Sequence, residues 1–267
     1  MGSKGKIIEQ AGQRIYLVKG IFDYFDAKNF PRLLEEWEEA KKENAKLYVG
    51  LYSDEVLERT NHKRRLKGKV TNQDRINMLE ALDFVDGAFI IDSLQREIIE
   101  AELKTKLYNQ TKEESEEITE NKAKYEIGYA SGAFSNLHKG HIEHLKEMKK
   151  QCRTTIVAVN SDELIKKYKN KTASVDEKTR RLILSHIRYV DVALITNEYD
   201  KMEALEVVKQ LCGEYFGAIF VGSDWKGDPN WENFEKKLNF MGIDVVFTDR
   251  PEKGISTTEI DKKGYSK

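Results

Sequence analysis

The sequence predicts an α/β fold made of two units with parallel sheets, the first of them truncated. In the C-terminal half, short apolar runs alternate with segments of helical periodicity, which is the pattern of βαβ units in a parallel sheet. The N-terminal half repeats the same order of motifs, and a polar stretch rich in Glu and Lys separates the halves. These three observations place a first domain at 13–92, a charged linker with helical character at 93–124, and a second domain at 125–267.

In the second domain, apolar runs of strand length alternate with amphipathic segments of helix length. The predicted strands are Ile127–Ala130, Thr155–Val159, Val192–Ile195, Ala218–Val221 and Val245–Phe247. The predicted helices are His141–Gln151, Glu177–Ile187, Met202–Leu211 and Trp231–Met241. Crossovers between neighbouring parallel strands are almost always right-handed, so each helix is expected on a defined face of the sheet.

The first domain begins in the same way. Strand Ile15–Val18 is followed by a helix whose apolar residues recur at i, i+3, i+4 and i+7 from Phe30 to Trp37, and then by strand Leu47–Tyr52. In the linker, apolar residues at Leu94 and Leu103 and between them indicate one more helix, and the remainder is expected to be solvated.

Four matches in the same order relate the two halves, and together they predict an internal duplication. They are a Gly-x-Phe turn after the first strand, a Ser-Asp-Glu turn, a helix that carries an early arginine, and a Val-Asp pair. Alignment of the two turn glycines puts Asp26 and Asn29 where the second half has His138 and His141. We therefore expect the chemistry in the second copy, with the first serving as its partner in an internal pseudo-dimer; further homodimerisation of whole chains stays open.

The composition is that of a charge-rich globular protein. Of its 267 residues, 34% are charged and 39% hydrophobic, and 45 basic residues nearly balance 46 acidic ones, for a net charge of -1. This balance gives no reason to expect nucleic acid or an anionic membrane as a partner. No apolar run approaches the roughly 20 residues that span a bilayer, and no secretory signal is visible. The 2 cysteines lack CxxC spacing, so we expect reduced thiols and a cytoplasmic protein.

The segment from Gly132 to His141 carries most of the functional information. It follows an apolar strand, contains two histidines three residues apart, and leads directly into a helix. Backbone N–H groups and the dipole at such a helix start can hold phosphate, and imidazoles there can donate hydrogen bonds to it. Two other interpretations stay open: His138 and His141 could be simple helix-capping residues, or they could bind zinc together with His144.

Further candidates follow along the chain. Lys169 and Lys171 are expected in the loop after the second Ser-Asp-Glu turn, where such a basic run is also typical of a solvated face. Arg180 and Arg188 can fork onto phosphate oxygens, although salt bridges would use them equally well.

Two later segments follow predicted strands, where open α/β sheets collect ligands. One contains Asp224 and Trp225, and the other begins at Arg250. In the latter, Ser256 or Thr257 could cap a last helix and present its free N–H groups to an anion.

The order of these motifs resembles the cytidylyltransferase family. The motifs are GxFxxxHxGHxxHL, a Ser-Asp-Glu turn, K-x-K, RxLIL with IRYVD, GSDWxG, and an arginine followed by GISTT. The similarity covers 125–260, and the bacterial glycerol-3-phosphate cytidylyltransferases are its nearest members. The N-terminal half resembles a shorter, degenerate copy, as in the tandem ethanolamine-phosphate cytidylyltransferases, although here the intact copy is the second. The resemblance implies two Rossmann-like nucleotidyltransferase units.

The resemblance also implies roles for individual residues. His138 and His141 would contact the CTP phosphates and stabilise the transferred phosphoryl group. The negative charge of the phosphates would be neutralised by Lys169, Lys171, Arg180 and Arg188. The remaining nucleotide contacts would come from Gly132, Ala133, Phe134, Asp224, Trp225, Arg250, Gly254, Ile255, Ser256 and Thr257. Mg²⁺ would enter with CTP by bridging its phosphate oxygens, and no protein metal ligand is implied.

Two departures from the family pattern bear on activity. The family has Gly-Thr-Phe-Asp where this chain has Ala133 and Ser135 at the second and fourth positions, so a hydroxyl and a carboxylate are missing. The segment Pro251–Lys253 is one residue longer than usual and would alter the substrate pocket.

Three hypotheses follow from these motifs. The first is transfer of CMP from CTP to a small phosphorylated alcohol such as glycerol 3-phosphate. The second is an adenylyltransferase that acts on a sugar phosphate or a similar molecule. The third is a pseudoenzyme that binds CTP with little or no turnover, which Ser135 motivates.

Overall fold

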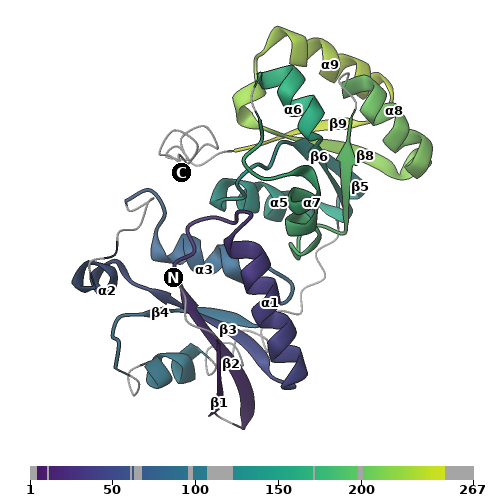
Figure 1. The fold of residues 1–267 in the computed structure, drawn as a ribbon. Coiled ribbons are helices and arrows are strands. Elements are labelled where there is room, and N and C mark those ends of the chain that lie inside the picture. The colour runs from purple at the N-terminus through teal and green to yellow at the C-terminus, as the bar shows by residue number, and fades with distance from the viewer. Residues whose placement is uncertain are drawn as a thin grey trace. The chain divides into compact units, whose positions relative to one another are not determined.

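Parallel strand pairing organises both halves of the chain, as Figure 1 shows. This computed structural model describes residues 5–10, 12–60, 62, 68–95, 99–106, 123–170, 172–197 and 201–249. The chain divides into two compact units, Met1–Glu120 and Asn121–Lys267. Among the described helices, none combines the length and the apolar character needed to cross a bilayer.

The second unit has a sheet in the order β7-β6-β5-β8-β9, and every neighbouring pair in it is parallel. Its strands are β5 (Tyr125–Gly132), β6 (Cys152–Asn160), β7 (Val192–Thr196), β8 (Phe216–Gly222) and β9 (Asp244–Thr248). Its helices are α5 (Lys139–Gln151), α6 (Asp162–Lys169), α7 (Glu177–Ser185), α8 (Lys201–Cys212) and α9 (Pro229–Phe240), with short 3-10 turns η1 (Gly213–Tyr215) and η2 (Ser223–Trp225). The predicted α/β fold with a parallel sheet is confirmed.

Side chains of successive strand residues point to opposite faces, and both faces of this sheet are covered. On β6, Ile156 and Ala158 join a core with residues of α8 and α9, whereas the intervening Val157 and Val159 are fully buried outside that cluster. A strand buried on both faces has a continuous apolar sequence, which is why the sequence marks these strands so clearly.

The strand order fixes where a ligand can bind. From β5 the chain moves outward to β6 and β7, and it then returns to place β8 and β9 on the other side of β5. Open parallel sheets bind ligands at the carboxyl ends of the strands beside such a reversal. The segment after β5 and turn η2 after β8 therefore both lie at this edge of the sheet.

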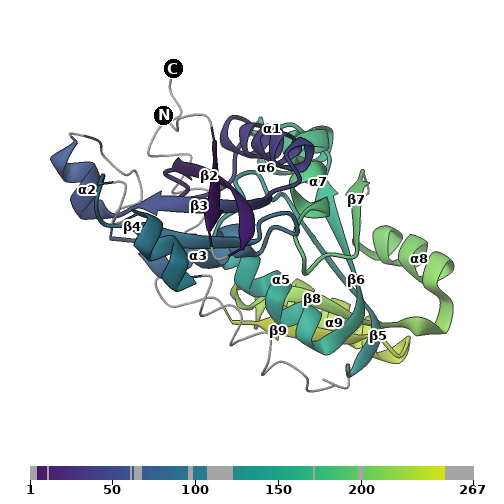
Figure 2. The same cartoon turned by 90° about the horizontal axis from the view of Figure 1, so that it is seen from below.

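The first unit has the sheet order β1-β2-β3-β4. Its strands are β1 (Lys6–Gln10), β2 (Gln13–Gly20), β3 (Lys46–Tyr52) and β4 (Gly87–Ile91), and its helices include α1 (Asn29–Lys42), α2 (Asp54–Arg59) and α3 (Asn72–Glu80). The pairs β2–β3 and β3–β4 are parallel, as expected. Figure 2 shows these elements from below.

Three features differ from the sequence prediction. β1 was not expected, and it pairs antiparallel with β2, so the first sheet is mixed. Residues 99–106 form the expected helix, but Ile99 and Leu103 are buried against the first sheet, so this part of the predicted linker belongs to the core of the first unit. Lys169 was expected in a loop and is instead the last residue of α6, because Ser161 caps that helix and Leu164 and Ile165 are buried under it.

The two units share several local structural features. The carboxylate of Asp86 accepts from the N–H of Leu47 at 2.8 Å, and that of Asp191 accepts from the N–H of Thr155 at 2.7 Å. Ser53 and Ser161 cap the helices that follow β3 and β6, respectively. Arg75 on α3 and Arg180 on α7 are each almost completely buried.

Candidate functional site

The backbone is strained immediately after β5. Phe134 has φ of 47°, a left-handed conformation that is unfavourable for a bulky residue. This turn brings the Phe134 ring to 5.1 Å from the His141 ring and buries Ser135 and Asn136. Strain of this kind persists only where surrounding packing enforces it, and it gathers at functional sites.

His138 is the N-cap of α5, His141 lies in its first turn, and together they form a capping box. Nδ1 of His138 accepts a hydrogen bond from the N–H of Gly140 at 3.2 Å, and Nδ1 of His141 accepts a longer one from the N–H of His138 at 3.5 Å. The rings stack with centroids 4.0 Å apart, and His138 is only 4% exposed. A ring nitrogen that accepts a hydrogen bond carries no proton, so both rings are neutral and carry their proton on Nε2. Each histidine thus has one N–H donor, on Nε2.

The capping and phosphate-binding interpretations of this pair are therefore compatible, since capping uses Nδ1 and phosphate binding would use Nε2. The first turn of α5 contains no acidic residue, so no side chain there opposes an anion. Zinc is not indicated among the described residues, where no three His, Cys, Asp or Glu side chains gather as a metal site would require.

Arg180 joins the elements around this turn. Its Nη1 donates to the carbonyl oxygens of Ala133 at 2.5 Å and Asn160 at 2.7 Å, and its Nε donates to Val175 at 2.9 Å. Its Nη2 forms an ion pair with Asp162 at 2.5 Å, and the side chain is 0% exposed. Four contacts from one buried guanidinium tie the end of β5 to the end of β6 and to α6. In this structure Arg180 positions the loop, and the expected phosphate contact stays a prediction.

The Asp162 carboxylate extends this network toward α7. Its Oδ2 accepts from the N–H of Glu177 at 3.2 Å, and the Glu177 carboxylate accepts from the N–H of Asp162 at 2.8 Å. Each acid therefore caps the start of the other's helix. Asp162 was seen in the sequence as part of a turn, and its role in holding Arg180 was not anticipated.

Turn η2 supplies an exposed aromatic group on the neighbouring strand. Asp224 and Trp225 follow β8 directly, Asp224 is exposed, and Trp225 is 45% exposed. The Trp225 ring lies 6.0 Å from that of Trp231, which is itself buried. An exposed ring backed by a second ring is suited to stack on a flat group such as a nucleobase.

A third histidine connects α5 to the far end of the sheet. Nδ1 of His144 lies 2.5 Å from the Thr248 hydroxyl at the end of β9, and this hydroxyl donates to the carbonyl of Val221 on β8 at 3.3 Å. This link was missed from the sequence. The signal available for it was the third histidine three residues after His141.

Some of the predicted site residues lie together at the carboxyl ends of β5 and β8, and others lie outside the described residues. Gly132, Ala133, Phe134, His138, His141 and Arg180 converge around the turn after β5, and Asp224 and Trp225 follow the neighbouring β8. Arg188 is exposed beyond the end of α7. Outside the described residues lie Lys171, Arg250, Gly254, Ile255, Ser256, Thr257 and the side chain of Lys169.

The IRYVD motif has a structural function. Oδ2 of Asp191 accepts hydrogen bonds from the N–H and hydroxyl of Thr155 at 2.7 and 2.9 Å and from Nζ of Lys149 at 2.6 Å. Partial burial acts to raise the pKa of Asp191, but the hydrogen bonds from Lys149 and Thr155 outweigh it and hold the pKa below its ordinary value. Asp191 therefore fastens β6 to the start of β7.

An α/β sheet with paired histidines at a helix start beside its strand reversal has the arrangement in which such sheets bind nucleotides. The model of the family described as cytidylyltransferase-like matches residues 129–263. The chain belongs to the cytidylyltransferase-like family and is a nucleotidyltransferase.

Two similar proteins are each matched over most of their own length. Glycerol-3-phosphate cytidylyltransferase of Staphylococcus aureus is 31% identical over 136 residues, which are 51% of this chain and 92% of the relative. FAD synthase of Thermoplasma volcanium is 34% identical over 116 residues, covering 43% and 75%. Among solved structures, a lipopolysaccharide core biosynthesis protein from Thermoplasma volcanium has a TM-score of 0.39 at 31% identity, covering 47% of this chain and 96% of that one.

Proposed function

We propose that the chain transfers the cytidylyl group of CTP to a small phosphorylated alcohol, with glycerol 3-phosphate as the first substrate to test. The products would be a CDP-alcohol, here CDP-glycerol, and pyrophosphate. The observation that carries this proposal is the neutral pair His138 and His141 at the start of α5, with one Nε2–H donor each. The relative from Staphylococcus aureus, by its name, acts on glycerol 3-phosphate and supports the choice of substrate.

The reaction needs no nucleophile from the protein. A phosphate oxygen of the alcohol phosphate attacks the α-phosphorus of CTP in line, the bond from the α-phosphorus to the bridging oxygen breaks, and pyrophosphate leaves with that electron pair. Negative charge builds up on the α-phosphate oxygens and on the leaving group. Hydrogen bonds from Nε2 of His138 and His141 and the partial positive end of α5 would stabilise this charge.

Positioning supplies much of the rate in such a reaction. Arg180 holds the turn after β5 to β6 and α6, so it fixes the histidines indirectly. Trp225 would stack on the cytosine and Asp224 would contact the cytidine, while Lys169, Lys171, Arg188 and the segment from Arg250 to Thr257 would neutralise the phosphates.

The nucleotide would enter as its magnesium complex. Mg²⁺ is usually held by one or two carboxylates together with substrate phosphates. Among the described residues no cluster of three possible ligands is present, and position 135 carries serine instead of a carboxylate. The ion is therefore expected to be bound mainly by the triphosphate and to enter and leave with the substrate.

The test is pyrophosphate release from the whole chain with each of the four nucleoside triphosphates and a panel of phosphorylated alcohols and sugars. The proposal predicts turnover with CTP and glycerol 3-phosphate, and none with CTP alone. Turnover with ATP and a sugar phosphate would establish the adenylyltransferase alternative. CTP binding by calorimetry without pyrophosphate from any acceptor would establish the pseudoenzyme, which the buried Ser135 favours.

We also propose that the two units arose by duplication. Support comes from the shared strand order β2-β3-β4 and β5-β6-β7 and from the matched pairs Asp86 and Asp191, and Arg75 and Arg180. In this proposal the first unit has lost the chemistry, since Asp26 and Asn29 replace the histidines.

A further inference from the structure

The start of α1 in the first unit is already occupied by a carboxylate. Oδ1 of Asp26 accepts hydrogen bonds from the N–H groups of Lys28 and Asn29, both at 2.8 Å, and Asp26 is 8% exposed. The corresponding position of the second unit carries the neutral His138. A buried negative charge at this place repels a phosphate and uses the N–H groups that would bind it.

Arg75, the arginine at this edge of the first sheet, is also held by protein partners. Nε of Arg75 lies 3.5 Å from Oδ1 of Asp23, and the two side chains are 0% and 5% exposed. Nη1 of Arg75 also donates to the carbonyl oxygen of Tyr52 at 2.9 Å and to the side chain of Asn72 at 3.1 Å. To bind a phosphate, Arg75 would have to leave a buried ion pair, which is a costly exchange.

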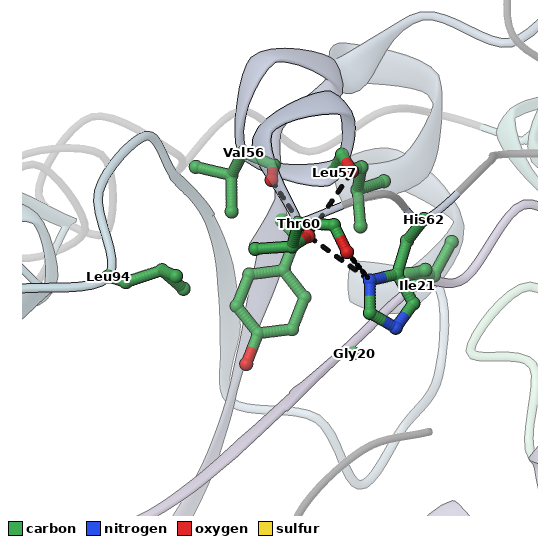
Figure 3. A pocket seen from close by; sticks show the side chains of 8 residues that line it. Gly20, Ile21, Val56, Leu57, Thr60, His62 and Leu94 are labelled. Carbon is green, nitrogen blue, oxygen red and sulfur yellow. Dashed lines mark hydrogen bonds between the residues drawn. The ribbon is translucent and has the colours of Figure 1, made fainter.

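The same edge nevertheless contains a pocket. Figure 3 shows it between the end of β2 and helix α2. Its volume is about 160 Å³. Its lining is Gly20, Ile21, Tyr52, Val56, Leu57, Thr60, His62 and Leu94. A cavity of about 150 Å³ is known to accept one benzene ring. The pocket therefore has the size of a single ring, and it lies at the carboxyl ends of β2 and β3.

The described lining combines apolar side chains with the polar groups of Tyr52, Thr60 and His62. Nδ1 of His62 lies 2.8 Å from the carbonyl oxygen of Thr60, which can only accept, so this nitrogen carries the proton. In the neutral ring Nε2 is then an acceptor, and Figure 3 shows this second nitrogen on the side of the ring away from Thr60.

The geometry points to a second ligand site, in the first unit, for a molecule with one ring and a hydrogen-bond donor. The apolar side chains hold the ring and Nε2 of His62 accepts from the donor. This inference does not depend on the proposed cytidylyltransferase activity, because it uses only residues of the first unit.

Phenol is a suitable probe, since it is uncharged at neutral pH, has one ring and carries one donor. We would titrate phenol into the whole chain with labelled Ile, Leu and Val methyl groups and follow the methyl resonances by NMR. Saturable shifts are expected at Ile21, Val56, Leu57 and Leu94, with a Kd in the millimolar range typical of so small a ligand. Benzoate, with the same ring but no hydrogen-bond donor at neutral pH, should bind at least about tenfold more weakly.

A matched pair of variants locates the site. Leu94 is 59% exposed and Phe240, on α9 of the second unit, is 94% exposed, so glutamate at either position adds a charge without disturbing a core. Leu94→Glu should weaken phenol binding at least about tenfold, and Phe240→Glu should leave it unchanged. An unchanged Kd in Leu94→Glu, or shifts confined to residues outside the lining, would overturn the site. Benzoate binding as tight as that of phenol would overturn the ligand class.

Discussion

The imidazole rings of His138 and His141 stack with their centroids 4.0 Å apart, and each accepts a backbone N–H through Nδ1. Capping thereby sets the tautomer of both rings at the start of α5. A ring held in one tautomer and one orientation does not have to reorganise when charge develops on a phosphate. The same contacts that stabilise the helix therefore prepare the two donors.

Removing one of these donors should impair turnover much more than stability. His141→Ala is expected to lower kcat by about 100-fold or more, as loss of one donor to a developing oxyanion does. The measurement is steady-state pyrophosphate release. Asn29→Ala is the matched control, since it removes side-chain hydrogen bonds to the N–H of Asp26 and the carbonyl of Tyr24 in the first unit, where it should cost about 1 kcal/mol of stability and leave kcat unchanged. Equal kcat in His141→Ala and the parent chain would contradict the assignment.

Arg180 should be essential to the fold of the second unit. Arg180→Lys keeps the charge but cannot reproduce contacts to Ala133, Asn160 and Asp162 from one planar group. We expect the second unit to lose about 3 kcal/mol or more of stability, measured by denaturant unfolding followed through its tryptophans. The exposed neighbour Arg181 provides the control, and Arg181→Lys should have almost no effect. A similar unfolding midpoint for both variants would show that the buried contacts contribute little.

Asp191 should make the protein sensitive to acid. Its pKa is lowered in the folded state, so its stabilising effect is fully present above the ordinary aspartate pKa of about 3.9 and is lost as the pH falls through the folded value. The free energy of unfolding should therefore decline below about pH 4. In Lys149→Met the pKa of Asp191 should rise, because a strong hydrogen-bond donor to it is gone. Carboxyl NMR titration of both proteins would detect this, and an unchanged pKa would contradict the role of Lys149.

Gly128 on β5 should tolerate no side chain. A Cβ at this position would overlap Sγ of Cys152 and approach the ring of Phe220 to 3.0 Å. Gly128→Ala is expected to destabilise the second unit by about 1–3 kcal/mol through overpacking. Cys152→Ala in the same chain should recover part of this loss, which a double-mutant cycle would measure as a favourable coupling. Strictly additive effects of the two substitutions would indicate that the contact with Phe220 dominates.

The fold was largely readable from the sequence because its strands are buried on both faces. The five predicted strands of the second unit are all present, and the observed ones extend beyond the predicted ends because hydrogen bonding continues past the apolar centre. β1 was not readable, because its half-exposed, polar sequence becomes a strand only by pairing with β2. Helix α6 was hidden for a similar reason: its capping residues were seen as a turn, and its basic surface obscured the buried Leu164 and Ile165.

The sequence by itself determined the α/β class, the order of the strands along the chain and the position of His138 and His141 at a helix start. These follow from local periodicity and from capping, which act over a few residues. Only the tertiary structure decided that Phe134 adopts a left-handed backbone conformation. It also decided that Arg180 binds three carbonyl groups and Asp162, and that His144 contacts Thr248 and so connects α5 to β9. Such contacts depend on segments far apart in the chain that meet at one edge of the sheet, and no local pattern encodes which donor meets which acceptor there.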